Sequence, residues 1–193
     1  MRNAAFFSLC CQFVTIYASA ADWPQYRGPT RNDVSAETGL LQAWPAEGPP
    51  LLWTYADAGI GYSGPAIVGD RLYTIGGRGD TEHLIALDPA SVKDGSVTEA
   101  WSTTVGQTFQ WEGNRWSAGP SSTPTVDGDL VYALGGMGDL LCVNTATGKE
   151  VWRKNLPEDL DAQVNPIGGG PKSLGWGFTW SPLVDGDRLV CLP

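Results

Sequence analysis

A degenerate unit recurs three times in this 193-residue chain, at intervals of 59 and 58 residues. Each copy has a proline, a short apolar run, a turn of Gly and Asp, and a second apolar run. Two short strands joined by a Gly/Asp turn predict a β-hairpin. A fixed period of this size indicates a repeat architecture. The copies begin at Pro65, Pro124 and Pro182, and the turn residues Asp70, Asp129 and Asp187 keep the same spacing.

The second copy continues with two further strand patterns, 139–144 and 150–155, around a tight turn. The first copy does the same with 82–88 and a strand around Trp101. Four antiparallel strands per repeat without helical periodicity are typical of a β-propeller blade. A sandwich of hairpins is the alternative, and the fixed period favours the propeller. We therefore expect an all-β chain of about two and a half four-stranded antiparallel blades: 62–105, 119–156 and an incomplete 180–193.

The segment from Cys142 to Trp152 resembles the tryptophan-docking motif of the pyrroloquinoline-quinone-repeat propellers. That pattern is Ala-x-Asp-x-x-Thr-Gly-Lys-x-x-Trp, and its Trp packs between neighbouring blades. Cys142 stands at the Ala position and Asn144 at the Asp position, while the matching residues are Thr147, Gly148, Lys149 and Trp152. The first repeat keeps Ala86, Asp88 and Trp101 but lacks the Thr-Gly-Lys turn. We expect Trp101 and Trp152 to be structural residues at equivalent outer-strand positions, with Trp152 well buried.

The motif is specific for the fold and weak for function, because such blades serve quinone dehydrogenases, assembly scaffolds and other proteins. The resemblance implies two main functions. One is a binding scaffold for an unknown protein or small-molecule ligand, which we prefer. The other is a quinoprotein dehydrogenase with pyrroloquinoline quinone (PQQ) and Ca²⁺, in which Trp116 or Trp180 would form an aromatic floor and Arg115 would pair a quinone carboxylate. No calcium triad or suitable cysteine pair is evident in this sequence, and no cofactor is predicted.

Residues 1–20 combine Arg2, an apolar stretch and Ala18-Ser-Ala20, the pattern of a secretory signal peptide. The predicted location is therefore periplasmic or secreted. No apolar segment is long enough to predict a transmembrane helix. A lipid-anchored assembly scaffold is disfavoured, because Leu9 rather than a small residue precedes Cys10.

Residues 21–61 predict an extended N-terminal arm, rich in Pro, Gly and polar residues. Within it, 51–55 predicts a lone strand, with Trp53 in the role of Trp152, that would close a propeller ring. Because two whole blades and part of a third cannot close a ring, we expect the chain to be a fragment of a longer propeller.

The formal net charge is −9, and the chain has no run of Lys or Arg, which disfavours nucleic acid as a partner. His83 is the only histidine, too few for a His-based metal site, and we predict no metal site. We interpret His83 as a solvated strand residue, with a catalytic base as the less favoured alternative. Cys142 and Cys191 are expected to be separate buried thiols.

The candidate ligand-binding residues lie where the inner strands begin. Ser63, Ser122 and Trp180 each stand two residues before a repeat proline. Arg115 and Trp116 lie in a long connection between blades, and long loops are often functional. We predict that these five residues converge on one face of the propeller. In the alternative, Trp116 and Trp180 only cover loop backbone.

Overall fold

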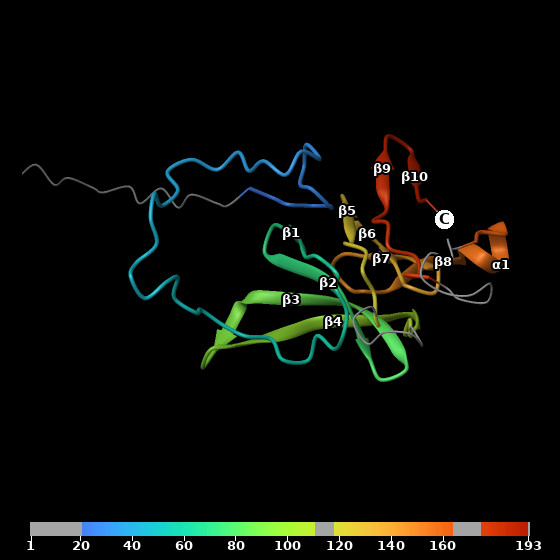
Figure 1. The fold of residues 1–193 in the computed structure, drawn as a ribbon, viewed down its shortest axis with the longest axis horizontal. Coiled ribbons are helices and arrows are strands. Elements are labelled where there is room, and N and C mark those ends of the chain that lie inside the picture. The colour runs from blue at the N-terminus through green and yellow to red at the C-terminus, as the bar shows by residue number, and fades with distance from the viewer. Residues whose placement is uncertain (1–20, 111–117, 164–174, 193) are drawn as a thin grey trace, which may run out of the picture.

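The computed structural model describes residues 21–110, 118–163 and 175–192, and its strands form two four-stranded antiparallel sheets and a separate hairpin (Figure 1). In both large sheets the spatial order follows the chain. The first sheet contains β1 (Ala66–Val68), β2 (Arg71–Arg78), β3 (Thr81–Lys93) and β4 (Ser96–Gln107). The second contains β5 (Thr125–Asp127), β6 (Leu130–Leu134), β7 (Asp139–Asn144) and β8 (Glu150–Asn155), and the hairpin contains β9 (Leu183–Asp185) and β10 (Arg188–Val190).

The strand registers confirm the repeat. Ala86 pairs with Trp101 across β3 and β4, and Cys142 pairs with Trp152 across β7 and β8, so the two Trp residues are equivalent. The first blade differs in its outer hairpin, because β3 and β4 extend to a two-residue turn at Asp94 and Gly95, both with positive φ. The longer connection predicted between Ala86 and Trp101 is thus an elongated hairpin.

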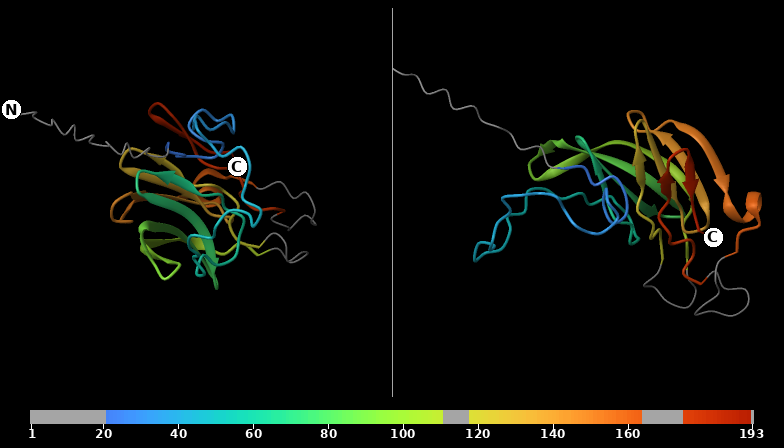
Figure 2. Two further views of the ribbon diagram at one scale, coloured as in Figure 1. Left: turned by 90° about the vertical axis from the view of Figure 1, so that its left-hand side faces the viewer. Right: turned by 90° about the horizontal axis from the view of Figure 1, so that it is seen from above.

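The main core lies between the two sheets, which are stacked face to face in Figure 2. Alternate residues of the middle strands point into this layer, as the period of a β-strand requires. Its members come from both sheets, so the hydrophobic effect holds the blades together: Ala66, Tyr73, Ile75, Leu84, Ala86 and Val105 from the first, and Val126, Val131, Ala133, Leu141 and Val143 from the second.

Trp101 joins the first blade to the outer turn of the second. Its indole N–H donates to the carbonyl of Thr145 at 2.9 Å, and its ring covers Gly148, where an added Cβ would lie 2.5 Å from the ring. Gly148 also has φ +66°, a conformation that glycine adopts cheaply. The Asn144 carboxamide oxygen accepts from Thr147 N at 3.2 Å, which shapes the turn. Trp101, Asn144 and Gly148 therefore all take part in this turn and its contact with the first blade.

Thr147 and Lys149 complete this turn, since the Lys149 N–H donates to the Thr147 hydroxyl at 3.3 Å while the Lys149 side chain is exposed. Trp152 is only partly buried in the described chain, less than the well-buried position predicted for it. It packs on Leu134, Leu140, Leu156 and Phe178. The described third repeat consists of β9 and β10, without an outer turn like the one that covers Trp101.

Within the described residues one short helix follows the second blade, α1 (Leu156–Leu160), capped by the Asn155 side chain, which accepts from Glu158 N at 3.0 Å. One further prediction needs correction. The strand predicted over 51–55 is not formed, and only Thr54 makes a single bridge, to Ser96. Trp53 instead packs on the face of the first sheet, against Ile85, Leu87 and Val97. Ring closure by this segment stays a prediction.

Within the described ranges, no helix is long and apolar enough to cross a membrane. The predicted signal peptide, residues 1–20, lies outside the described residues.

Candidate functional site

The segments that lead into β1, β5 and β9 lie side by side and are joined by backbone and hydroxyl hydrogen bonds. Tyr62 N donates to the carbonyl of Pro120 at 2.7 Å, and Thr123 N donates to the Ser181 hydroxyl at 2.9 Å. The Thr125 hydroxyl donates to the carbonyl of Pro182. These bonds cross from the first repeat to the second and from the second to the third. We call this surface, made by residues 60–64, 119–123 and 179–181, the entry face.

Ser63 and Ser122 occupy equivalent places on the entry face. Ser63 Oγ accepts from Ile75 N at 3.1 Å, and Ser122 Oγ donates to the carbonyl of Leu134. Both hydroxyls therefore hold the incoming segment on the second strand of their own blade. Ser122 is fully buried and Ser63 is partly buried. Their equivalence follows from the repeat, and a direct role in ligand binding stays a prediction.

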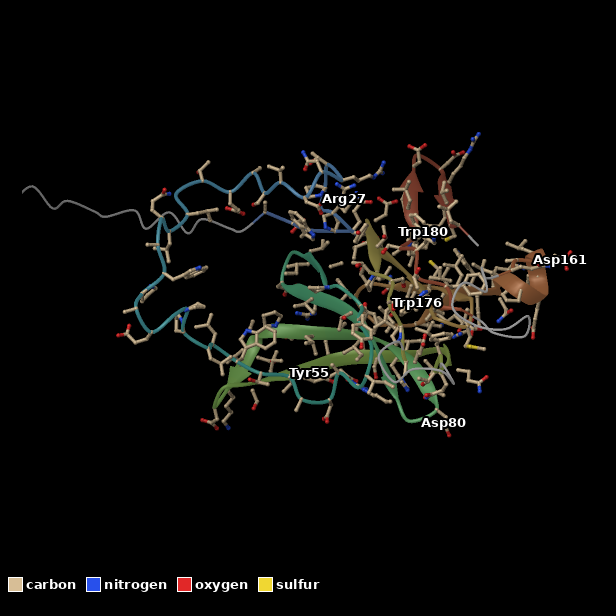
Figure 3. All side chains as sticks on the ribbon, viewed as in Figure 1. Arg27, Tyr55, Asp80, Asp161, Trp176 and Trp180 are labelled. Atoms are coloured by element: carbon tan, nitrogen blue, oxygen red, sulfur yellow. The ribbon has the colours of Figure 1, made fainter. Side chains whose placement is uncertain are left out.

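Trp180 stands at the same repeat position as the two serines, but its side chain is 58% exposed. Two further aromatic residues near the inner-strand starts are exposed, Tyr62 at 62% and Trp176 at 50%. Figure 3 shows Trp176 and Trp180 beside the second and third repeats, away from Tyr55 on the first blade. Neither Tyr62 nor Trp176 is among the five residues predicted from the sequence to bind a ligand. Arg115 and Trp116 lie outside the described residues, so their convergence with the others stays a prediction.

A polar cluster joins the N-terminal arm to the first blade. The Glu99 carboxylate accepts from the Tyr55 hydroxyl and from the Arg78 guanidinium, both at 2.6 Å. Arg78 Nε also donates to the carbonyl of Asp57 at 2.7 Å. Tyr55, Arg78 and Glu99 line an open pocket of about 780 Å³, but they bond to one another and to the arm. The cluster therefore fastens residues 55–57 to the blade.

The pKa values of this cluster reflect these bonds. Burial raises the pKa of Glu99, but hydrogen bonds from Ser102, Tyr55 and Arg78 outweigh burial and bring it to about 2. Burial and the hydrogen bond to Glu99 raise the pKa of Tyr55 to about 12. Glu99 is thus a carboxylate and Tyr55 a neutral phenol at neutral pH, which leaves neither suited to transfer a proton.

Glu82 is a fully buried carboxyl group that spans the two blades. Its Oε1 accepts from Phe109 N at 3.1 Å, and its Oε2 accepts from Gly136 N at 2.8 Å. Burial raises its pKa, and the two backbone hydrogen bonds oppose that shift. The neighbouring His83 bonds to the Thr81 hydroxyl at 2.8 Å, and burial followed by the charge of Arg78 lowers its pKa. Neither side chain reaches the entry face through a described contact.

The described residues do not fit a calcium-bound quinone. Across the described ranges, no three Asp, Glu, His or Cys side chains gather closely enough to hold a metal ion. Ca²⁺ requires six to eight oxygen ligands. Cys142 and Cys191 are free thiols, the first buried and the second partly buried, as expected for separate cysteines. We therefore derive no reaction step through a quinone.

The stacked four-stranded sheets with adjoining inner strands define the chain as part of a β-propeller. A family model described as "Outer membrane protein assembly factor BamB" matches residues 92–193, more than half of the chain. The chain belongs to this family of PQQ-like repeat propellers.

Curated relatives match over shorter stretches. The glycerol dehydrogenase large subunit of Gluconobacter oxydans (strain 621H) is 39% identical over 49 residues, which are 25% of this chain and 6% of that protein. The outer membrane protein assembly factor BamB of Burkholderia pseudomallei (strain K96243) is 33% identical over 72 residues, 37% of this chain and 16% of that protein. These matches span less than a fifth of each relative's length.

A solved europium-containing methanol dehydrogenase aligns with a TM-score of 0.49 and 19% identity, over 72% of this chain and 22% of that structure.

Proposed function

We propose that this chain is a propeller scaffold of an exported protein, and that it binds a protein ligand at the entry face. The observation that carries the proposal is the exposure of Tyr62 and Trp180 on segments that are already hydrogen-bonded between repeats. Exposed aromatic side chains are frequent anchors of interfaces, because they bury a large area at a small entropic cost. A preorganised backbone lowers the ordering cost further.

The name of the matched family favours a protein ligand over a sugar or a nucleotide. The Burkholderia relative is named as a factor in outer membrane protein assembly. We extend that class of partner to this chain as a proposal. The predicted signal peptide supports the same compartment, since outer membrane proteins pass through the periplasm.

The experiment is a titration of the chain with an extended synthetic peptide that carries aromatic residues at alternate positions, followed by tryptophan fluorescence and calorimetry. We expect saturable binding, weakened roughly tenfold or more by Trp180→Ala, because an aromatic anchor contributes about 1–2 kcal/mol or more. Trp44→Ala is the matched control, since Trp44 is 67% exposed but lies in the arm. Equal weakening by both variants, or no binding at all, would contradict the proposal.

The glycerol dehydrogenase similarity favours a quinoprotein as the second candidate. Equilibrium dialysis of the chain against PQQ with Ca²⁺ tests it. Saturable binding at micromolar quinone that is lost in Trp180→Ala would reverse our order of preference. If the wild type and Trp180→Ala retained equal amounts of quinone, the quinone would be bound at a place other than Trp180.

A further inference from the structure

The inner strands β1, β5 and β9 each present one edge that no second strand covers. Their middle residues are Ile67, Val126 and Val184, which keep the repeat intervals of 59 and 58 residues. In each hairpin the flanking residues pair with the second strand around a two-residue turn. The middle residue therefore turns its N–H and C=O towards the uncovered edge. We call the uncovered edges of these three strands the inner edge.

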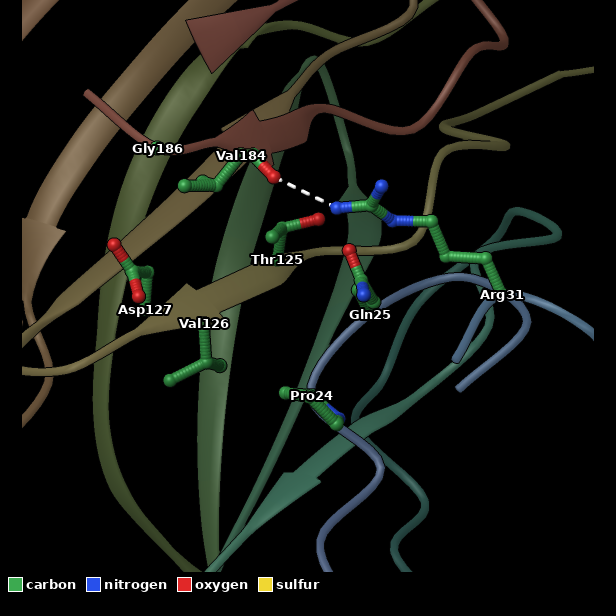
Figure 4. Close-up of a pocket in the computed structure, with 8 residues that line it drawn as sticks. All are labelled: Pro24, Gln25, Arg31, Thr125, Val126, Asp127, Val184 and Gly186. Carbon is green, nitrogen blue, oxygen red and sulfur yellow. Dashed lines mark hydrogen bonds between the residues drawn. The ribbon is translucent and has the colours of Figure 1, made fainter. Parts of the chain in front are cut away.

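One short segment of the N-terminal arm bonds to the inner edge in all three repeats. Trp23 N donates to the carbonyl of Ile67 at 2.7 Å, and Ile67 N donates to the carbonyl of Trp23 at 2.9 Å. Val126 N donates to the carbonyl of Pro24 at 2.8 Å. In the third repeat, Arg31 Nη2 donates to the carbonyl of Val184 at 2.8 Å (Figure 4).

The segment has its own fixed shape. Its backbone turns through bonds from Gly28 N to the carbonyl of Gln25 at 3.0 Å and from Arg31 N to the carbonyl of Gly28 at 3.2 Å. The Trp23 indole lies against Gly28, where an added Cβ would come within 2.7 Å of the ring. Arg27 pairs with Asp33 at 2.7 Å within the segment. Residues 22–33 therefore form a compact unit that meets the blades as one piece.

Side chains at both ends of the unit select its register. The Asp22 carboxylate accepts from Gly69 N, in the turn of the first hairpin, at 2.8 Å. At the other end Arg31 reaches across a pocket of about 360 Å³, whose lining includes Gln25, Thr125 and Asp127 (Figure 4). The backbone hydrogen bonds hold the segment on the strands, and the Asp22 and Arg31 side chains fix its register, as when a peptide adds to a sheet edge.

We propose that the inner edge is a polypeptide-binding site, and that its ligand is the chain's own segment 22–31. The site recognises an extended dipeptide, Trp23-Pro24, followed by a turn that places the Arg31 guanidinium on β9. The chain thus closes the inner edge against other strands, which protects groups that could otherwise template aggregation. This inference does not depend on the function proposed for the entry face.

The test uses a labelled peptide of residues 21–33 and the full chain carrying Trp23→Ala, which removes the indole that packs on Gly28 and fixes the shape of the tethered segment. We expect the peptide to bind this variant saturably, and the wild-type chain at least roughly tenfold more weakly, because the tethered segment competes at a high effective concentration. A peptide with Arg31→Ala should bind roughly tenfold more weakly than the native peptide. A peptide with Tyr26→Ala is the matched control, because Tyr26 is 60% exposed and lies outside the pocket.

Amide hydrogen exchange gives a second readout in the same proteins. In Trp23→Ala the N–H groups of Ile67, Gly69 and Val126 should exchange faster, while the ladder of β6 and β7 keeps its protection. Added native peptide should restore the three amides. Should Trp23→Ala not fold, Arg31→Ala replaces it in both assays. Unchanged exchange, or peptide binding that ignores the Arg31 substitution, would overturn the proposal.

Discussion

Removal of the Glu82 carboxylate should be among the most destabilising single changes in the described chain. Its two oxygens accept the N–H groups of Phe109 and Gly136, at 3.1 and 2.8 Å, in a fully buried position. Gly136 belongs to the second blade and Phe109 to the connection between blades. Glu82→Leu removes both acceptors, whereas Glu82→Gln keeps one acceptor and turns an N–H towards the other backbone N–H.

The magnitude follows from the number of bonds lost. A hydrogen bond to a charged group is worth about 1.5–3 kcal/mol, so loss of both costs about 3–6 kcal/mol. Burial of the leucine side chain returns about 1.5–3 kcal/mol. The two ranges leave about 0–4.5 kcal/mol, so we expect a net loss of about 2 kcal/mol for Glu82→Leu and about 1–3 kcal/mol for Glu82→Gln.

Urea unfolding of the three proteins measures these losses as shifts of the midpoint at constant slope. Glu150→Gln is the control, because Glu150 is exposed and forms only a surface pair with Arg153, worth less than about 1 kcal/mol. If Glu82→Leu shifted the midpoint no more than the control, the claim that Glu82 holds the blades together would be refuted.

The sign of the pH dependence gives an independent check on Glu82. Burial raises its pKa above the ordinary value of about 4.3. The folded chain therefore binds the proton more tightly than the unfolded chain. Glu82 therefore contributes fully to the free energy of unfolding at pH values below its ordinary pKa, and this contribution declines as the pH rises towards the raised pKa. Glu82→Gln should abolish that decline.

Three further predictions concern other groups. The pKa of Glu99 in the folded chain, about 2, lies below its value in the unfolded chain. The stability that Glu99 contributes should therefore be lost as the pH falls from about 4.3 towards 2. The urea midpoints of the wild type and of Glu99→Gln should converge over that pH range. Trp101→Phe should cost about 1–3 kcal/mol in the same assay, because the Thr145 carbonyl loses its donor and the turn loses packing area; a change near zero would remove Trp101 from the contact between blades. Burial raises the pKa of both cysteines to about 11, so the fully buried Cys142 should resist iodoacetamide at pH 8 in the folded chain and react after denaturation, and Cys191 should react first.

The strands and the outer docking contact could be predicted from the sequence because their signals are local. The alternation of apolar residues, the Gly/Asp turns and the motif ending at Trp152 each lie within a dozen residues. The strand registers in the structure match these patterns, including the equivalence of Trp101 and Trp152. Trp152 is less buried than predicted, because burial depends on what packs on it from the next repeat.

The contacts that could not be predicted use backbone groups distant in sequence. Glu82 looks like an ordinary strand residue, and its partner Gly136 lies 54 residues away. The contacts of Trp23 and Pro24 with the inner edge are likewise backbone bonds, which leave no side-chain signature. Residues 51–55 resemble a strand in sequence because they are mostly apolar. In the structure only Trp53 and Tyr55 pack on the sheet face, Leu51 and Leu52 are exposed, and the backbone forms a single bridge.

The polar contacts between the first two repeats lie at three distances from the inner edge. Trp101 bonds to Thr145 at the outer strand, Glu82 bonds to Gly136 at the middle strands, and segment 22–31 crosses the inner strands. The shared apolar core and these polar contacts together fix the angle between the two blades. The relative placement of Tyr62 and Trp180 on the entry face therefore depends on these contacts as well as on the bond from Tyr62 N to the carbonyl of Pro120. A change at Glu82 or Trp101 should alter ligand binding at the entry face only to the extent that it loosens the blades.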